Sequence, residues 1–200
     1  MKRSGLGLTG SLGVRAPVLA AVLVAAVVAA CGGGVAGPTP RPGATSFQEF
    51  RTANCAAWES MFLAVGNPDT ASGSELSLAL DDAIASGDLA TADLKAAAIR
   101  AELEAGRGHA AVAGAWPPAA VPMTQLDRVF VAFEAYVEAE RAAAGKGLSV
   151  AKQEAQAALM ATGAGEAWRL LLTPETWAEV NAARPANVRP ERCGDLPISF

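Results

Sequence analysis

Three cysteines and one histidine are the residues of this 200-residue chain best suited to covalent or acid–base chemistry. A Ser–His–Asp or Cys–His device needs a histidine that a third group holds beside a nucleophile. His109 follows Gly106-Arg107-Gly108, which is typical of a solvated loop at a helix end. A single histidine is also too few for a typical zinc site. We therefore expect no catalytic residues, no metal site and no cofactor.

Two close pairs of carboxylates, Asp81-Asp82 and Glu138/Glu140, are the other candidates for acid–base chemistry. Neighbouring acidic side chains on a helix point in different directions, because successive residues are not on one face. A run of charges is usually a solvated helix face. We interpret both pairs in that way, so an enzyme is the weakest of the functional hypotheses.

Cys31 stands directly after 13 apolar residues, Val18–Ala30. Three basic residues precede this run: Lys2, Arg3 and Arg15. A membrane-spanning helix needs about 20 apolar residues, whereas the apolar part of a secretory signal has about 7–15. The length therefore predicts an export signal. An ordinary secretory signal with an incidental cysteine is one interpretation.

The four residues Val28-Ala29-Ala30-Cys31 resemble the lipobox of bacterial lipoproteins, in which a branched apolar residue and two small residues precede the lipid-bearing cysteine. The resemblance implies cleavage before Cys31 and acylation of its thiol with a diacylglyceryl group, carrying fatty acids such as palmitate. It also implies a protein anchored to the extracytoplasmic face of the cell membrane, on the periplasmic side where the cell has an outer membrane.

This interpretation divides the chain into a signal peptide (1–30), a lipidated flexible tether (31–45) and a folded domain (46–200). The tether is rich in Gly, Pro and Thr and has no periodic apolar residues, which is typical of a linker. Loss of the signal removes three basic residues and no acidic ones, so the net charge falls from −4 to about −7. A domain of that charge without a basic cluster is poorly suited to nucleic acid.

Cys55 and Cys193 remain in the exported part of the chain. A pair of cysteines in an oxidising compartment predicts a disulfide, which here would join the first helix of the domain to the C-terminal tail. Two separate buried thiols are the alternative.

The mature domain is predicted to be all-α, a single helical bundle of about five or six helices. Alanine is abundant, and apolar residues recur at intervals of three and four, as along one face of a helix. The first three expected helices run from Ser46 to Val65, from a cap at Ser72 and Glu75 to Ser86-Gly87, and from Asp88 or Thr91 to Gly106. The fourth begins at Thr124, and the next is capped by Ser149 and broken at Gly163 or Gly165. The last two cover Glu166–Leu172 and begin at Thr173-Pro174-Glu175.

Trp116 lies in the Pro-rich stretch between the predicted third and fourth helices. The other tryptophans have helical spacing and are expected in the core. Trp116 is expected either to plug the bundle or to contact a ligand or partner.

Three functional hypotheses follow. The leading one is a membrane-anchored, non-enzymatic binding or protein-interaction module of the cell envelope, with an envelope protein as partner. The alternative is a carrier of a small apolar ligand or lipid between its helices, which requires a cavity. The third is an enzyme built on the scattered carboxylates.

Overall fold

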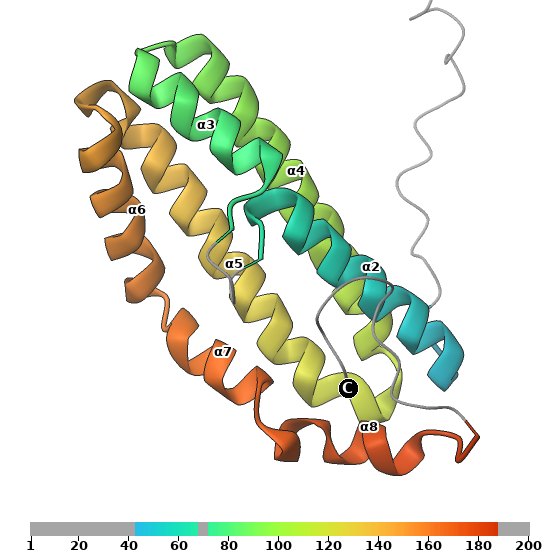
Figure 1. Ribbon diagram of the computed structural model, residues 1–200. Coiled ribbons are helices and arrows are strands. Elements are labelled where there is room, and N and C mark those ends of the chain that lie inside the picture. The colour runs from blue at the N-terminus through green and yellow to red at the C-terminus, as the bar shows by residue number, and fades with distance from the viewer. Residues whose placement is uncertain (1–42, 68–71, 188–200) are drawn as a thin grey trace, which may run out of the picture. The chain divides into compact units, whose positions relative to one another are not determined.

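The computed structural model describes residues 43–67 and 72–187 (Figure 1). Seven α-helices of these residues pack together, which confirms the all-α bundle. They are α2 (Phe47–Val65), α3 (Glu75–Ser86), α4 (Leu89–Gly114), α5 (Ala120–Ala143), α6 (Leu148–Ala161), α7 (Ala164–Leu171) and α8 (Ala178–Ala183). Three short 3-10 helices connect them: η2 (Pro117–Ala119), η3 (Ala144–Lys146) and η4 (Pro174–Trp177). The predicted signal peptide, Cys31, most of the tether and Cys193 lie outside the described residues.

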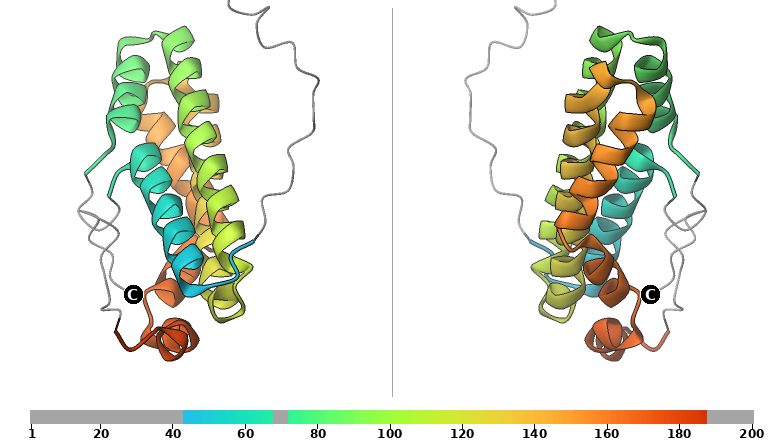
Figure 2. Two further views of the ribbon diagram at one scale, coloured as in Figure 1. Left: turned by 90° about the vertical axis from the view of Figure 1, so that its right-hand side faces the viewer. Right: turned by 90° about the vertical axis from the view of Figure 1, so that its left-hand side faces the viewer.

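Two long helices, α4 and α5, pack against each other at the centre of the bundle. The helices α2 and α3 follow one another along α4, and α6 and α7 follow one another along α5 (Figures 1 and 2). The helices therefore form four packed columns: α4, α5, α2 followed by α3, and α6 followed by α7. The last two columns are interrupted. Both interruptions lie between helices that were expected to be separate, and the described residues contain seven α-helices where about five or six were expected.

The ends of the first two helices are set by local hydrogen bonds. Ser46 caps α2 as predicted, because its Oγ accepts a hydrogen bond from the backbone N–H of Glu49 at 3.3 Å. The predicted cap of α3 at Ser72 is wrong. Ser74 is the cap instead: its Oγ accepts from the N–H of Ser77 at 3.0 Å and donates to the carbonyl of Ala64 at 2.8 Å. That second bond ties the start of α3 to the end of α2.

The predicted end of the third helix at Gly106 is wrong, because α4 continues to Gly114. Gly106 is needed for close packing and not for helix termination. A Cβ added there would lie 2.4 Å from the ring of Phe130 on α5 and 3.1 Å from the Cβ of Ser60 on α2. His109 consequently lies inside a helix and not in a loop. The expected loop is a short turn at η2.

Later boundaries show a similar mixture. The predicted fourth helix is α5, which begins at Ala120 and not at Thr124. The hydroxyl of Thr124 donates to the Ala120 carbonyl within this helix. The next helix begins at Leu148, directly after Gly147, and not at Ser149. The predicted break at Gly163 is confirmed, because this residue has φ +72° and separates α6 from α7. The start at Thr173-Pro174 is confirmed as the 3-10 turn η4, which leads into α8.

Two glycine substitutions in α4 test the close approach of the helices. We expect Gly106→Ala to lower the free energy of unfolding by about 1–3 kcal/mol, because Phe130 is fully buried and its ring cannot move aside without disturbing the core. Gly108→Ala is the matched control, since its added Cβ meets nothing within 4 Å. It should raise the free energy of unfolding by about 0.5–1 kcal/mol through better helix propensity. Urea titrations measure both, and equal effects would contradict the packing role of Gly106.

Candidate ligand-binding cavity

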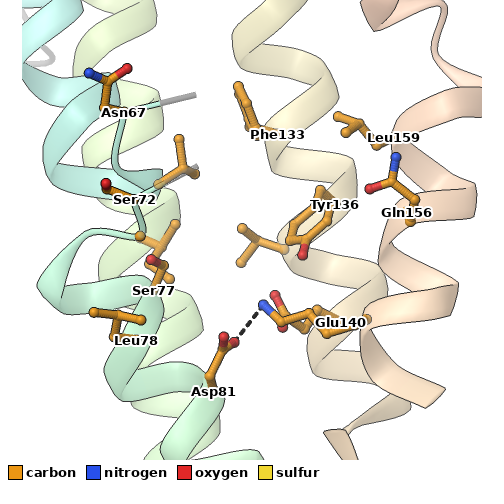
Figure 3. Close-up of a pocket in the computed structure, with 15 residues that line it drawn as sticks. Asn67, Ser72, Ser77, Leu78, Asp81, Phe133, Tyr136, Glu140, Gln156 and Leu159 are labelled. Atoms are coloured by element: carbon orange, nitrogen blue, oxygen red, sulfur yellow. Dashed lines mark ion pairs between the residues drawn. The ribbon is translucent and has the colours of Figure 1, made fainter. Parts of the chain in front are cut away.

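A cavity of about 360 Å³ lies between α3 and α6, with α5 as its back wall (Figure 3). Its apolar lining comes from the end of α2 and from four other helices: Val65, Leu78, Ile99, Phe133, Val137 and Leu159. Its polar lining includes Ser77, Asp81, Tyr136, Glu140, Lys152 and Gln156. A small cavity with an apolar wall and a few converging polar groups has the usual composition of a ligand site.

Three charged side chains meet at one end of this cavity. The ammonium of Lys152 on α6 lies 2.5 Å from a carboxylate oxygen of Asp81 on α3 and 2.6 Å from one of Glu140 on α5. The Glu140 side chain is only 2% exposed, whereas those of Asp81 and Lys152 are 27% and 35% exposed. The cluster therefore joins three helices and presents two of its members toward the open part of the cavity.

Burial controls the ionisation of this cluster. It raises the pKa of Glu140, and the nearby Asp81 carboxylate adds to the rise, although the ion pair with Lys152 opposes it. Burial disfavours the charge of Lys152, but its hydrogen bonds to the two carboxylates outweigh that effect and hold its pKa above the usual range. Lys152 is therefore a fixed cation at neutral pH.

Tyr136 completes the charged end of the cavity. Its half-buried ring lies 5.6 Å from the Lys152 nitrogen, measured to the ring centroid, which is within the range of a cation–π contact. Burial is the main cause that raises the pKa of its hydroxyl, and the Glu140 carboxylate acts in the same direction. The phenol of Tyr136 therefore stays neutral at physiological pH.

The carboxylate pairs expected to face solvent divide into two kinds. Glu138 meets that expectation: it is exposed and pairs with Arg100 at 3.3 Å and with Arg141 at 3.1 Å. For Glu140 and Asp81 the expectation was wrong, since they are brought together by Lys152. The spacing held a signal for Glu140, which continues the apolar stripe of α5 one turn after Tyr136 and Val137. No sequence pattern around Lys152 indicated that it would pair with these two carboxylates.

Trp116 lies in the turn before η2, and its side chain is 8% exposed. Its ring stacks on Phe50 at 5.1 Å between centroids and meets the ring of Phe47 edge-on at 5.7 Å. Of the two roles expected for this residue, the contacts are those of a plug that closes one end of the bundle. It does not line the cavity between α3 and α6.

The remaining predicted site residues are the cysteines. Cys55 is half-buried on α2, and its thiol is not free. Cys193 lies outside the described residues, so the disulfide between the two stays a prediction. The same holds for lipid attachment at Cys31.

Comparisons of the chain with protein-family models, with curated proteins and with solved structures find no match. Within residues 43–67 and 72–187, no helix is both long and apolar enough to cross a membrane. The same residues contain no group of three or more His, Cys, Asp or Glu side chains placed to hold a metal ion. The side chains of the cavity are therefore the observations on which a function can be built.

Removing the Lys152 charge tests the electrostatics of the cluster. At pH 8 we expect Lys152→Met to lower the free energy of unfolding by about 3–5 kcal/mol, because the carboxylate of Glu140 is then buried without its partner. A group whose pKa is higher in the folded state loses its contribution as the pH rises through that folded pKa. The loss in Lys152→Met should therefore be smaller near pH 4.5, where Glu140 can be protonated, and grow toward pH 8.

Urea unfolding at several pH values between these limits measures the effect. Lys146→Met is the matched control on the neighbouring 3-10 turn, because its 3.8 Å ion pair with Glu154 is exposed. It should change the free energy of unfolding by less than about 1 kcal/mol at every pH. A loss in Lys152→Met that is the same at pH 4.5 and pH 8 would be inconsistent with a buried, titrating Glu140.

Proposed function

We propose that the protein is a lipid-anchored, non-enzymatic binding protein of the cell envelope that holds a small ligand between its helices. The observation that carries the proposal is the cavity between α3 and α6, which combines an apolar wall with a charged end. Its volume of about 360 Å³ is near the lower limit for ligand sites, which favours a small molecule. The cavity meets the requirement of the carrier hypothesis, but its charged end favours a ligand that is only partly apolar.

The surface gives less support to a role in binding another protein. The most exposed apolar side chains of the described residues include Leu94 on α4, Met160 on α6 and Leu172 at the end of α7. Single apolar residues on separate helices are ordinary on a soluble surface, whereas protein interfaces usually need a contiguous patch. The cavity is therefore the better basis for a function.

The location belongs to the same proposal and rests on the sequence. Cys31 would carry the lipid, and the segment 31–45 would connect it to the domain. A disulfide between Cys55 and Cys193 suits the oxidising conditions outside the cytoplasm. Together these features would hold the domain, with its cavity, at the extracytoplasmic face of the membrane.

The anchor is tested with Cys31→Ser in the full chain, expressed in a bacterial host. We expect the wild-type protein to incorporate a labelled fatty acid and to sediment with membranes, and Cys31→Ser to lose both properties. Cys55→Ser is the control, because it removes a cysteine that the anchor does not use. Label retained by Cys31→Ser would rule out the proposed lipid site.

Ligand capture is tested by native mass spectrometry of the full chain purified gently from its membranes. We expect a discrete extra mass that disappears on denaturation. Gln156→Trp places a bulky ring at an exposed position that lines the cavity and should reduce the liganded fraction several-fold. Gln153→Trp, also exposed on α6 but outside the lining, should leave it unchanged. Equal loss in both variants, or no extra mass in the wild type, would count against a carrier.

A further inference from the structure

We infer that the ligand of the cavity is a small organic cation, an amine or quaternary ammonium group attached to an apolar body. This inference rests on the proposed function, because it names the chemical class that the same cavity would select. Three observations support it: the net charge of Asp81, Glu140 and Lys152, the partners of the Lys152 ammonium, and the separation of the polar from the apolar side chains that line the cavity.

The cluster has more negative than positive charge when its members are ionised. Asp81 and Glu140 supply two carboxylates, and Lys152 is the single cation paired with them. A carboxylate has about four lone-pair sites, and Lys152 occupies one oxygen of each. The charged end of the cavity therefore retains acceptors and, when both carboxylates are ionised, one surplus negative charge.

The donors of Lys152 are already directed elsewhere, which disfavours an anionic ligand. An ammonium has three donors, and two of them meet the carboxylates at 2.5 and 2.6 Å. The nitrogen also lies 5.6 Å from the centroid of the Tyr136 ring, in a cation–π contact. An anion bound at this end of the cavity would lie near two carboxylates and a single cation that is already paired with both.

The surroundings strengthen the attraction for a cation. Glu140 is 2% exposed, and charges interact more strongly where water is excluded. Asp81 is the accessible carboxylate, because its side chain is 27% exposed and reaches into the cavity from α3 (Figure 3). The ring of Tyr136 also lines the cavity, and aromatic rings attract cations. Ser77 and Gln156 add neutral acceptors at the wall and the mouth.

The apolar lining lies away from the charged end. Figure 3 shows Phe133 and Leu159 on the side of the cavity opposite Asp81 and Glu140. A ligand would therefore place its positive group at Asp81 and its apolar body against Phe133. At about 30 Å³ for each water-sized group, the cavity has room for roughly a dozen non-hydrogen atoms.

Three probes of similar size and different charge test the inference: phenethylammonium, phenethyl alcohol and phenylacetate. Each is titrated into the full chain in a nonionic detergent, and binding is measured by calorimetry and by the shift in thermal midpoint. We expect phenethylammonium to bind at least tenfold more tightly than the alcohol and to raise the midpoint by about 3–6 °C at ten times its dissociation constant. Phenylacetate should produce no shift.

Neighbouring acids supply matched variants. Asp81→Asn should weaken phenethylammonium about tenfold, to the level of the alcohol, because it removes the accessible carboxylate. Asp82→Asn, an exposed residue outside the lining, should leave the affinity unchanged. Should Asp81→Asn fail to fold, Gln156→Glu adds a carboxylate at the mouth and should tighten phenethylammonium several-fold, whereas Gln153→Glu should not.

The outcomes separate this inference from the proposed function. If phenethyl alcohol or phenylacetate binds in the cavity more tightly than phenethylammonium, the inference of a cationic ligand is wrong, whereas the proposed carrier function still stands. If none of the three probes binds and the ligand carried by the native protein is not a cation, the inference of a cationic ligand is also wrong and the carrier function stands. Failure of the probes together with a native protein that carries no ligand contradicts both. Unchanged phenethylammonium affinity in Asp81→Asn overturns the assigned position of the charge.

Discussion

The ammonium of Lys152 joins three helices by holding a carboxylate from each of the other two, and the candidate site depends on this contact. The helices α3 and α6 pack mainly on α4 and α5 and have little direct contact with each other. Lys152 spans the space between them and pairs with Glu140 on the back wall. Without this cation, a carboxylate that is 2% exposed would have no counter-charge, and the two sides of the cavity would lose their link.

The cavity itself follows from the interruption of one column of the bundle. A continuous helix beside α4 would place side chains along its whole length, whereas α2 ends at Val65 and α3 begins ten residues later at Glu75. The residues next to this break are joined by a backbone hydrogen bond, which the Asn67 N–H donates to the Ser72 carbonyl at 2.9 Å. Val65 and Asn67 before the break and Ser72 after it line the cavity, so the described residues on both sides of the break border the open volume.

The sequence predicted local structure better than long-range contacts. The cap at Ser46 follows from backbone chemistry within a few residues, so residue types were enough to find it. At the third helix and at the later break they narrowed the choice to two residues each, Asp88 or Thr91 and Gly163 or Gly165, of which the structure has Asp88 and Gly163. Gly106 was misleading because glycine serves both to end helices and to let helices approach closely, and only the packed structure distinguishes these uses.

The candidate site was harder to foresee because its members are far apart in sequence. Asp81, Glu140 and Lys152 come from three helices, and no local pattern joins them. The continuation of the α5 stripe was a signal that Glu140 is buried, but nothing in the stripe identifies its partner. A buried acid implies that some compensating group exists, and the fold decides which one.

Two buried polar side chains of the described core show why the α3–α6 cavity, and not another part of the interior, is the candidate site. Asn54 on α2 is fully buried, and among the described residues neither of its amide atoms has a hydrogen-bond partner. Such a group costs about 1–3 kcal/mol, but Asn54 does not line the cavity between α3 and α6. Glu140 is nearly as buried, yet it has a charged partner and borders open volume. A buried ion pair gives little net stability compared with well-packed apolar residues, so the stability of the fold is by itself a weak explanation for the place of Glu140 in the wall of this cavity.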